Sequence, residues 1–147
     1  MKKILLFCLL VLLLSCAKIP NKNSNKISID NGKKIIKLNV DIADDNQERQ
    51  NGLMFRERLD EDSGMFFIFD EQDYQTFWMK NTLIPLDMIF IDKDFQIVDI
   101  KNAVPCKADP CALYKSSKPA LYVLEANSNF TARNDIKVGD RIIFSQK

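Results

Sequence analysis

Alternating apolar and polar residues indicate where the folded part of this chain begins. Between residues 36 and 42, apolar side chains occupy every second position, with charged or amide side chains between them. The two sets are Ile36, Leu38, Val40 and Ile42, and Lys37, Asn39 and Asp41. Since successive side chains of a strand point to opposite faces, the pattern predicts a half-buried strand over residues 36–42.

Other apolar segments predict more strands. Residues 65–69, Met-Phe-Phe-Ile-Phe, are continuously apolar, which predicts a strand covered on both faces. Further strands are predicted at residues 76–80, 86–91, 95–100, 120–125 and 141–145. Asp92, Lys93 and Asp94 separate two of them at hairpin spacing, and an aspartate there tolerates a left-handed turn conformation.

One short helix is predicted between the strands. Asp44 and Asp45 followed by Glu48 are typical of a helix N-terminus, and Gly52 is a suitable end. Many short strands with one or two short helices predict a mainly β fold, either a β-sandwich or a barrel-like sheet. The 147-residue chain has room for one such domain, which we place at residues 35–147.

The N-terminus has the pattern of an export signal. Lys2 and Lys3 precede an unbroken apolar run from residue 4 to residue 14, which is too short for a permanent membrane span. Ser15 and Cys16 end the run, and together these features resemble the lipobox of bacterial lipoproteins. The resemblance implies that residues 1–15 are a removable signal peptide and that Cys16 is lipidated.

The segment after Cys16 is expected to be a flexible tether. Residues 16–34 are rich in Lys and Asn and contain little that a core would bury. The expected location is therefore the cell envelope, with the domain on the periplasmic or extracellular face. Ala17 carries no aspartate-type retention signal, which favours the outer membrane in a cell that has one.

Composition excludes several kinds of chemistry. If Lys2 and Lys3 leave with the leader, acidic residues outnumber basic ones by one, so the domain has no charge excess for binding nucleic acid. The chain contains no His, which rules out a Ser-His-Asp triad and makes zinc or Cu(II) sites unfavourable. We therefore expect no cofactor. The expected partners are the membrane and an unidentified envelope ligand or protein.

Cys106 and Cys111 form an even pair within the predicted domain. In an oxidising compartment such a pair predicts a disulfide, and Ala108, Asp109 and Pro110 between them suit a turn. A metal site or a redox-active pair is the alternative. Two cysteines without His are too few ligands for zinc, and a redox pair usually has closer spacing.

Several sequence patches together resemble a known family. They are Gly52-Leu53-Met54-Phe55-Arg56, Gly64-Met65-Phe66-Phe67, Phe77-Trp78-Met79-Lys80-Asn81-Thr82, Ile84-Pro85-Leu86-Asp87, Leu121-Tyr122-Val123-Leu124-Glu125 and Gly139-Asp140. In this order they resemble the domain of unknown function (DUF) 192 family over residues 36–145. The resemblance implies a compact, β-rich, often exported domain and supplies no established activity. Asn129 and Asp135 replace family glycines, and both residue types tolerate positive φ.

Three charged residues among apolar neighbours are candidates for a site. They are Arg56, Asp87 and Glu125. In the structural hypothesis, Arg56 forms an ion pair with one of the two carboxylates. In the catalytic hypothesis, Asp87 and Glu125 are an acid/base pair and Arg56 holds an anion. That hypothesis predicts that Asp87→Asn abolishes turnover and leaves stability nearly unchanged.

The predicted strand at residues 76–80 supplies further candidates. Phe77 and Met79 face one side of it and Trp78 and Lys80 the other, so one aromatic residue is a candidate for a surface groove. With Asn81 and the three charged residues, Trp78 and Lys80 form the proposed ligand groove or polar network.

Four methionines suggest a third possibility. Met54, Met65, Met79 and Met88 offer thioethers, which bind Cu(I), although methionine is also a routine core residue. The preferred function is a lipid-anchored, non-catalytic binding or interaction module. The alternatives are an envelope enzyme that uses the two carboxylates and a Cu(I) carrier.

Overall fold

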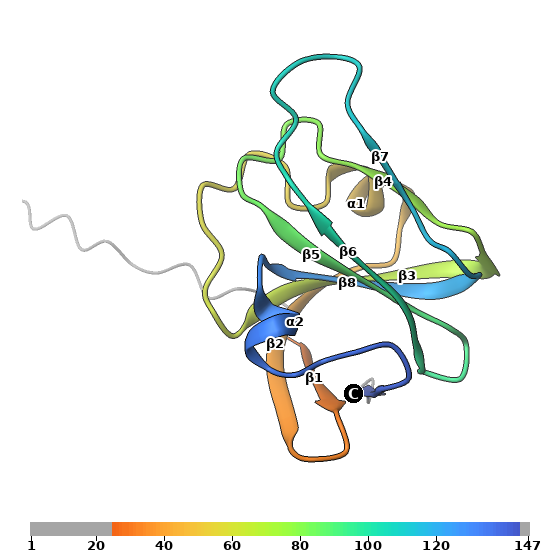
Figure 1. Ribbon diagram of the computed structural model, residues 1–147. Coiled ribbons are helices and arrows are strands. Elements are labelled where there is room, and N and C mark those ends of the chain that lie inside the picture. The colour runs from red at the N-terminus through yellow and green to blue at the C-terminus, as the bar shows by residue number, and fades with distance from the viewer. Residues whose placement is uncertain (1–24, 145–147) are drawn as a thin grey trace, which may run out of the picture.

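The computed structural model describes residues 25–144, in which nine strands and two short helices form a mainly β fold, as predicted (Figure 1). Seven strands form one mixed sheet in the order β6-β5-β8-β3-β2-β1-β9. These strands are β1 (Asn25–Asp30), β2 (Ile35–Ala43), β3 (Ser63–Asp73), β5 (Leu86–Ile91), β6 (Ile97–Ala103), β8 (Ala120–Asn127) and β9 (Arg141–Phe144). A second, two-stranded sheet pairs β4 (Thr76–Trp78) with β7 (Leu113–Lys115).

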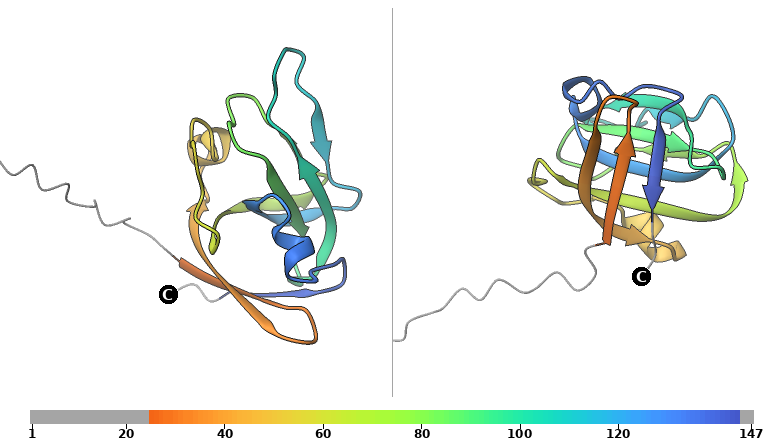
Figure 2. Two further views of the ribbon diagram at one scale, coloured as in Figure 1. Left: turned by 60° about the vertical axis from the view of Figure 1, so that its left-hand side comes forward. Right: turned by 90° about the horizontal axis from the view of Figure 1, so that it is seen from below.

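The large sheet curls until its two edges approach each other, which gives the barrel-like form expected from the many short strands (Figure 2). The Gln96–Arg141 bridge joins the start of β6 to the start of β9. Backbone hydrogen bonds of 2.8 Å from Ile142 N to Phe95 O and from Ile97 N to Asp140 O extend this contact. Closure of this kind satisfies backbone groups that an open edge leaves unpaired.

Two apolar clusters cover the two faces of the curled sheet. The inner cluster includes Ile27, Leu38, Val40, Phe66, Ile89, Leu124, Phe130 and Ile142. The outer cluster includes Leu53, Met65, Phe67, Met79, Leu86, Met88, Phe90 and Val123, against which Phe77 and Tyr114 pack from β4 and β7. Neighbouring residues Phe66 and Phe67 are thus buried on opposite faces, which confirms that β3 is covered on both.

Residues that the sequence marked for turns adopt the expected conformations, with one exception. Helix α1 (Asn46–Asn51) begins after Asp45, whose carboxylate accepts a 2.7 Å hydrogen bond from Glu48 N, and ends at Gly52. Asn129 and Asp135, on either side of helix α2 (Phe130–Arg133), have φ of 63° and 55°. In the β5–β6 turn, however, the left-handed residue is Phe95, with φ of 60°, and not an aspartate.

The predicted domain boundary is too late in the chain. Strand β1 begins at Asn25, within the segment expected to be a tether. Its Ile27 and Ile29 are fully buried because β1 lies between β2 and β9, so two isoleucines in a polar segment suffice for a strand. The predicted signal peptide and Cys16 lie outside the described residues. Within residues 25–144, neither helix has the length and apolar character needed to span a membrane.

Gly64 allows β3 and β8 to approach closely. A Cβ atom at this position would lie 2.6 Å from the Glu125 backbone oxygen, which is closer than side-chain carbons come to a carbonyl. We expect Gly64→Ala to lower the free energy of unfolding by about 2 kcal/mol, measured by urea denaturation. Gly32→Ala is the control, because its Cβ would meet nothing within 4 Å, although its φ is +78°. A loss at Gly64 no larger than at Gly32 would contradict the close approach.

Candidate functional site

Asp87 accepts hydrogen bonds in the interior of the fold. Its side chain is fully buried on the inner face of β5 and accepts four hydrogen bonds. They come from Asn102 Nδ2 at 2.7 Å, Asn129 N at 3.1 Å, Thr131 N at 2.9 Å and Thr131 Oγ1 at 2.6 Å. The carboxylate thus holds the start of α2 against the sheet, and its acceptor sites are occupied.

Glu125 is buried without a comparable set of partners. Its side chain is 5% exposed and lies on the outer face of β8, directly opposite Met65 on β3 and Met88 on β5. No hydrogen bond or ion pair within residues 25–144 ends on its carboxyl group, whose oxygens keep only a small contact with solvent. Burial raises the pKa of Glu125 from 4.5 to about 8, so the acid is protonated at neutral pH.

The two carboxyl groups lie on opposite sides of the sheet. In the β5–β8 register Asp87 opposes Ala126, whereas Glu125 opposes Met88. Because successive side chains of a strand alternate between faces, Asp87 points into the inner cluster and Glu125 into the outer one. A substrate cannot lie between them, so the structure does not provide the acid/base pair of the catalytic hypothesis.

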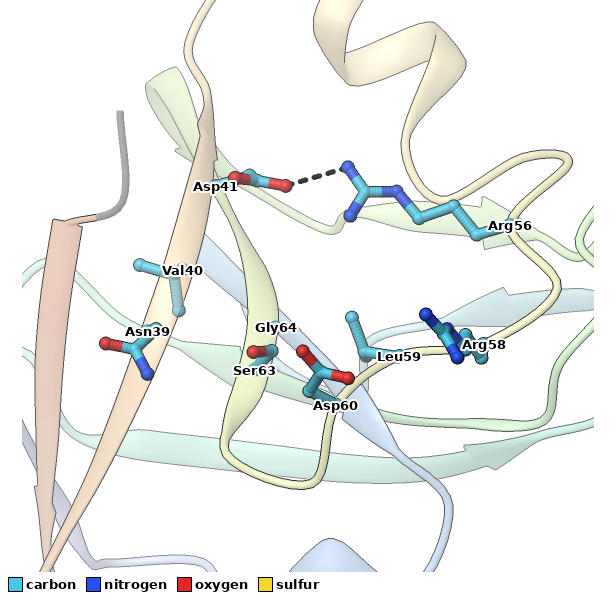
Figure 3. A pocket seen from close by; sticks show the side chains of 9 residues that line it. All are labelled: Asn39, Val40, Asp41, Arg56, Arg58, Leu59, Asp60, Ser63 and Gly64. Carbon is cyan, nitrogen blue, oxygen red and sulfur yellow. Dashed lines mark hydrogen bonds and ion pairs between the residues drawn. The ribbon is translucent and has the colours of Figure 1, made fainter. Parts of the chain in front are cut away.

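Arg56 pairs with Asp41. The prediction that it holds Asp87 or Glu125 is wrong. Its Nη2 lies 2.7 Å from Asp41 Oδ2. The guanidinium reaches this carboxylate from the loop that precedes β3, across a pocket of about 360 Å³ (Figure 3). The pocket is lined by Asn39, Val40, Asp41, Arg56, Arg58, Leu59, Asp60, Ser63 and Gly64. Its two arginines and two aspartates balance in charge, so it does not favour anions over cations.

Trp78 and Lys80 lie together at the surface, as the strand pattern predicts, and Asn81 is exposed in the turn that follows β4. Trp78 is 46% exposed, and the Lys80 ammonium lies 5.6 Å from the centre of its ring. Asn81 has φ of 58°, and its carbonyl accepts a 2.8 Å hydrogen bond from Phe55 N. This bond places the turn at Asn81 beside the loop that carries Arg56, while Asp87 and Glu125 are separate from the group.

Leu113, which was not among the predicted site residues, extends this surface. Leu113 on β7 is directly opposite Trp78 and is 68% exposed. A three-residue strand is too short to show a period of two, so no sequence pattern indicated a role for Leu113. We call Trp78 and Leu113 the apolar surface.

The predicted disulfide between Cys106 and Cys111 is present in the loop between β6 and β7. Asp109 lies beside it, with its Oδ1 3.5 Å from Cys111 Sγ. The two sulfurs and this carboxylate are the one set of at least three Cys, Asp or Glu ligand atoms that gathers closely within residues 25–144. Since the sulfurs are bonded to each other, they do not act as thiolate ligands in this state.

Three of the four methionines belong to the outer apolar cluster. Met65, Met79 and Met88 are buried there, while Met54 is only partly buried and lies near Asn81 Nδ2. The three buried residues pack with Phe67, Phe90 and other apolar side chains, which is the usual role of core methionine.

Comparison with known proteins places the chain in a family. A family model, DUF192, described as "Uncharacterized ACR", matches residues 27–144. The chain belongs to the DUF192 family. No curated protein matches it.

Two crystal structures resemble this DUF192 chain. A protein from Sinorhizobium meliloti, described as a candidate transcription regulator, is 36% identical with a TM-score of 0.77, over 83% of this chain and 94% of its own. A protein of unknown function from Novosphingobium aromaticivorans is 35% identical with a TM-score of 0.76, over 81% and 84%. These likenesses support the DUF192 fold and leave its activity unassigned.

Proposed function

We propose that this DUF192 protein is anchored to the cell envelope by lipid on Cys16 and acts as a non-catalytic binding module. The basic start, the apolar run and the cysteine that ends it support the anchor. Two or more acyl chains hold a protein at a membrane without a spanning helix. The domain faces the periplasm or the cell exterior, on the outer membrane where the cell has one.

One observation carries the binding role. Trp78 and Leu113 lie directly opposite each other on β4 and β7, and both expose a large apolar side chain to solvent. Apolar side chains that gather at a surface indicate an interaction site more often than isolated ones do. The buried carboxylates, in contrast, offer no shared position for a substrate.

The start of β1 at Asn25 keeps this module close to the membrane. Residues 16–24 separate the proposed lipid from the first strand, and nine residues span at most about 30 Å. The domain therefore stays within about its own diameter of the bilayer, and its ligand is expected at or near that surface.

The anchor is tested by growth with labelled palmitate. We expect label in the wild-type protein and none after Cys16→Ser. Absence of label from the wild type, or its persistence in the variant, would contradict lipid attachment at Cys16.

The apolar surface is tested through Trp78, which is the single tryptophan of the chain. With the fluorescent probe anilinonaphthalene sulfonate, we expect energy transfer from Trp78 in the wild type and a weaker signal after Leu113→Asp. Ile143→Asp is the matched control, because Ile143 is 53% exposed on the distant strand β9. Equal signals from all three proteins would contradict a binding role for this surface.

A further inference from the structure

A largely apolar pocket of about 540 Å³ lies beside the apolar surface, between the end of β4, the end of β6 and the loop that leads to β7. We call it the loop pocket. It is lined by Met79, Val104, Pro105, Cys106, Lys107, Ala108, Ala112 and Tyr114. Its volume is within the range of small-molecule sites, and Lys107 is its one charged residue. The loop that forms it is the top of the molecule in Figure 1.

The walls of the loop pocket are fixed by covalent and hydrogen bonds. The Cys106–Cys111 disulfide closes the loop, with 5.4 Å between the two Cα atoms. Cys106 N donates to the carbonyl of the buried Met79 at 3.4 Å. Val104 N donates to the Tyr114 hydroxyl oxygen at 3.1 Å. A pocket held at these points needs little ordering when a ligand enters.

Charge at the loop pocket favours an anionic group. Lys107 is exposed, and no ion pair joins its ammonium to another residue in the described part of the chain. The nearby Lys80 is instead neutralised by Asp109, with Nζ 3.4 Å from Oδ2. The pocket therefore combines apolar walls with a single uncompensated positive charge, which complements a ligand with an apolar body and one negative head.

We propose that the loop pocket binds the acyl chain of a fatty acid and that Lys107 binds its carboxylate. The inference deepens the proposed function and rests on it, because the anchor keeps the domain within reach of membrane acyl chains. Met79, Val104, Pro105 and Tyr114 supply apolar contacts for the chain. The exposed position of Lys107 leaves the carboxylate in contact with water as well as with the ammonium.

The test uses the full-length protein in isolated membranes and a photoreactive, alkyne-tagged fatty acid. We expect irradiation to attach the probe to residues 104–114, as mapped by mass spectrometry. The methyl ester of the probe, which lacks the negative charge, is expected to label about three- to fivefold less. Lys107→Glu is expected to lower labelling by the free acid by a similar factor, whereas the control Lys93→Glu, on the exposed β5–β6 turn, is not.

A second variant tests the pocket itself. Ala112→Phe fills the loop pocket and is expected to remove labelling of residues 104–114 while Trp78 still transfers energy to anilinonaphthalene sulfonate, which shows that the surface is intact. Label located elsewhere, or equal labelling by acid and ester, would overturn the inference. If labelling fails and energy transfer from Trp78 persists, the binding module remains and the fatty acid is excluded. If residues 104–114 are labelled and Cys16 carries no palmitate, the anchor fails and the pocket stands.

Discussion

Replacement of Glu125 by Gln is expected to remove a large part of the pH dependence of stability. In the folded protein the pKa of Glu125 is about 8, because the carboxyl is desolvated between Met65 and Met88, whereas its ordinary value is 4.5. Between these two pH values the folded chain keeps a proton at Glu125 that the unfolded chain has lost. Stability contributed by the protonated acid is therefore complete below pH 4.5 and declines as the pH rises to about 8.

The expected loss is large because the two pKa values are far apart. Their difference corresponds to roughly 5 kcal/mol in the free energy of unfolding. Urea denaturation at a series of pH values measures this contribution. It is the free energy of unfolding of the wild type minus that of Glu125→Gln at the same pH. We expect this difference to fall by several kcal/mol from pH 4 to pH 9. Glu61→Gln, at an exposed position, is expected to leave the wild-type profile unchanged. Parallel profiles for wild type and Glu125→Gln would show that the buried acid does not control stability.

Asp87→Ala is expected to destabilise the protein by about 3–5 kcal/mol, because it leaves buried donors without an acceptor. Four hydrogen bonds end on this carboxylate, three of them from the start of α2. Urea denaturation is the measurement. Thr131→Val, which removes the 2.6 Å bond from the hydroxyl, is expected to cost about 1–2 kcal/mol.

The same experiment separates the structural role of Asp87 from the catalytic hypothesis. The catalytic hypothesis expects a substitution at Asp87 to stop turnover and leave stability nearly unchanged. Asp94→Ala, an exposed carboxylate on the β5–β6 turn, is the control for loss of a negative charge. If Asp87→Ala and Asp94→Ala are equally stable, the buried hydrogen bonds do not hold α2 in place.

Short-range patterns explain why much of the sheet was predictable. The alternation at residues 36–42 lies within β2, and the apolar run at residues 65–69 lies within β3, because burial on one face or two faces directly shapes those patterns. Asn129 and Asp135 have the positive φ that replacement of glycine implies. These features depend on residues that are close together in the chain, so they can be predicted from the sequence.

Features that depend on distant neighbours were missed. Strand β1 has two isoleucines in a polar segment and is buried because β9, from the other end of the chain, covers it. Arg56 binds Asp41 because the parallel pairing of β2 with β3 turns that aspartate toward the loop before β3. Asp87 and Glu125 both lie among apolar residues, and only the register of β5 on β8 shows that they face opposite ways.

The pairing of β1 with β9 also determines when the barrel can close. Ile27 opposes Phe144, so the first described strand gains its second neighbour from the last one. Contacts between such distant segments form late, and they are unavailable while synthesis is incomplete. A nascent polypeptide with this topology cannot close its barrel until β9 has been synthesised.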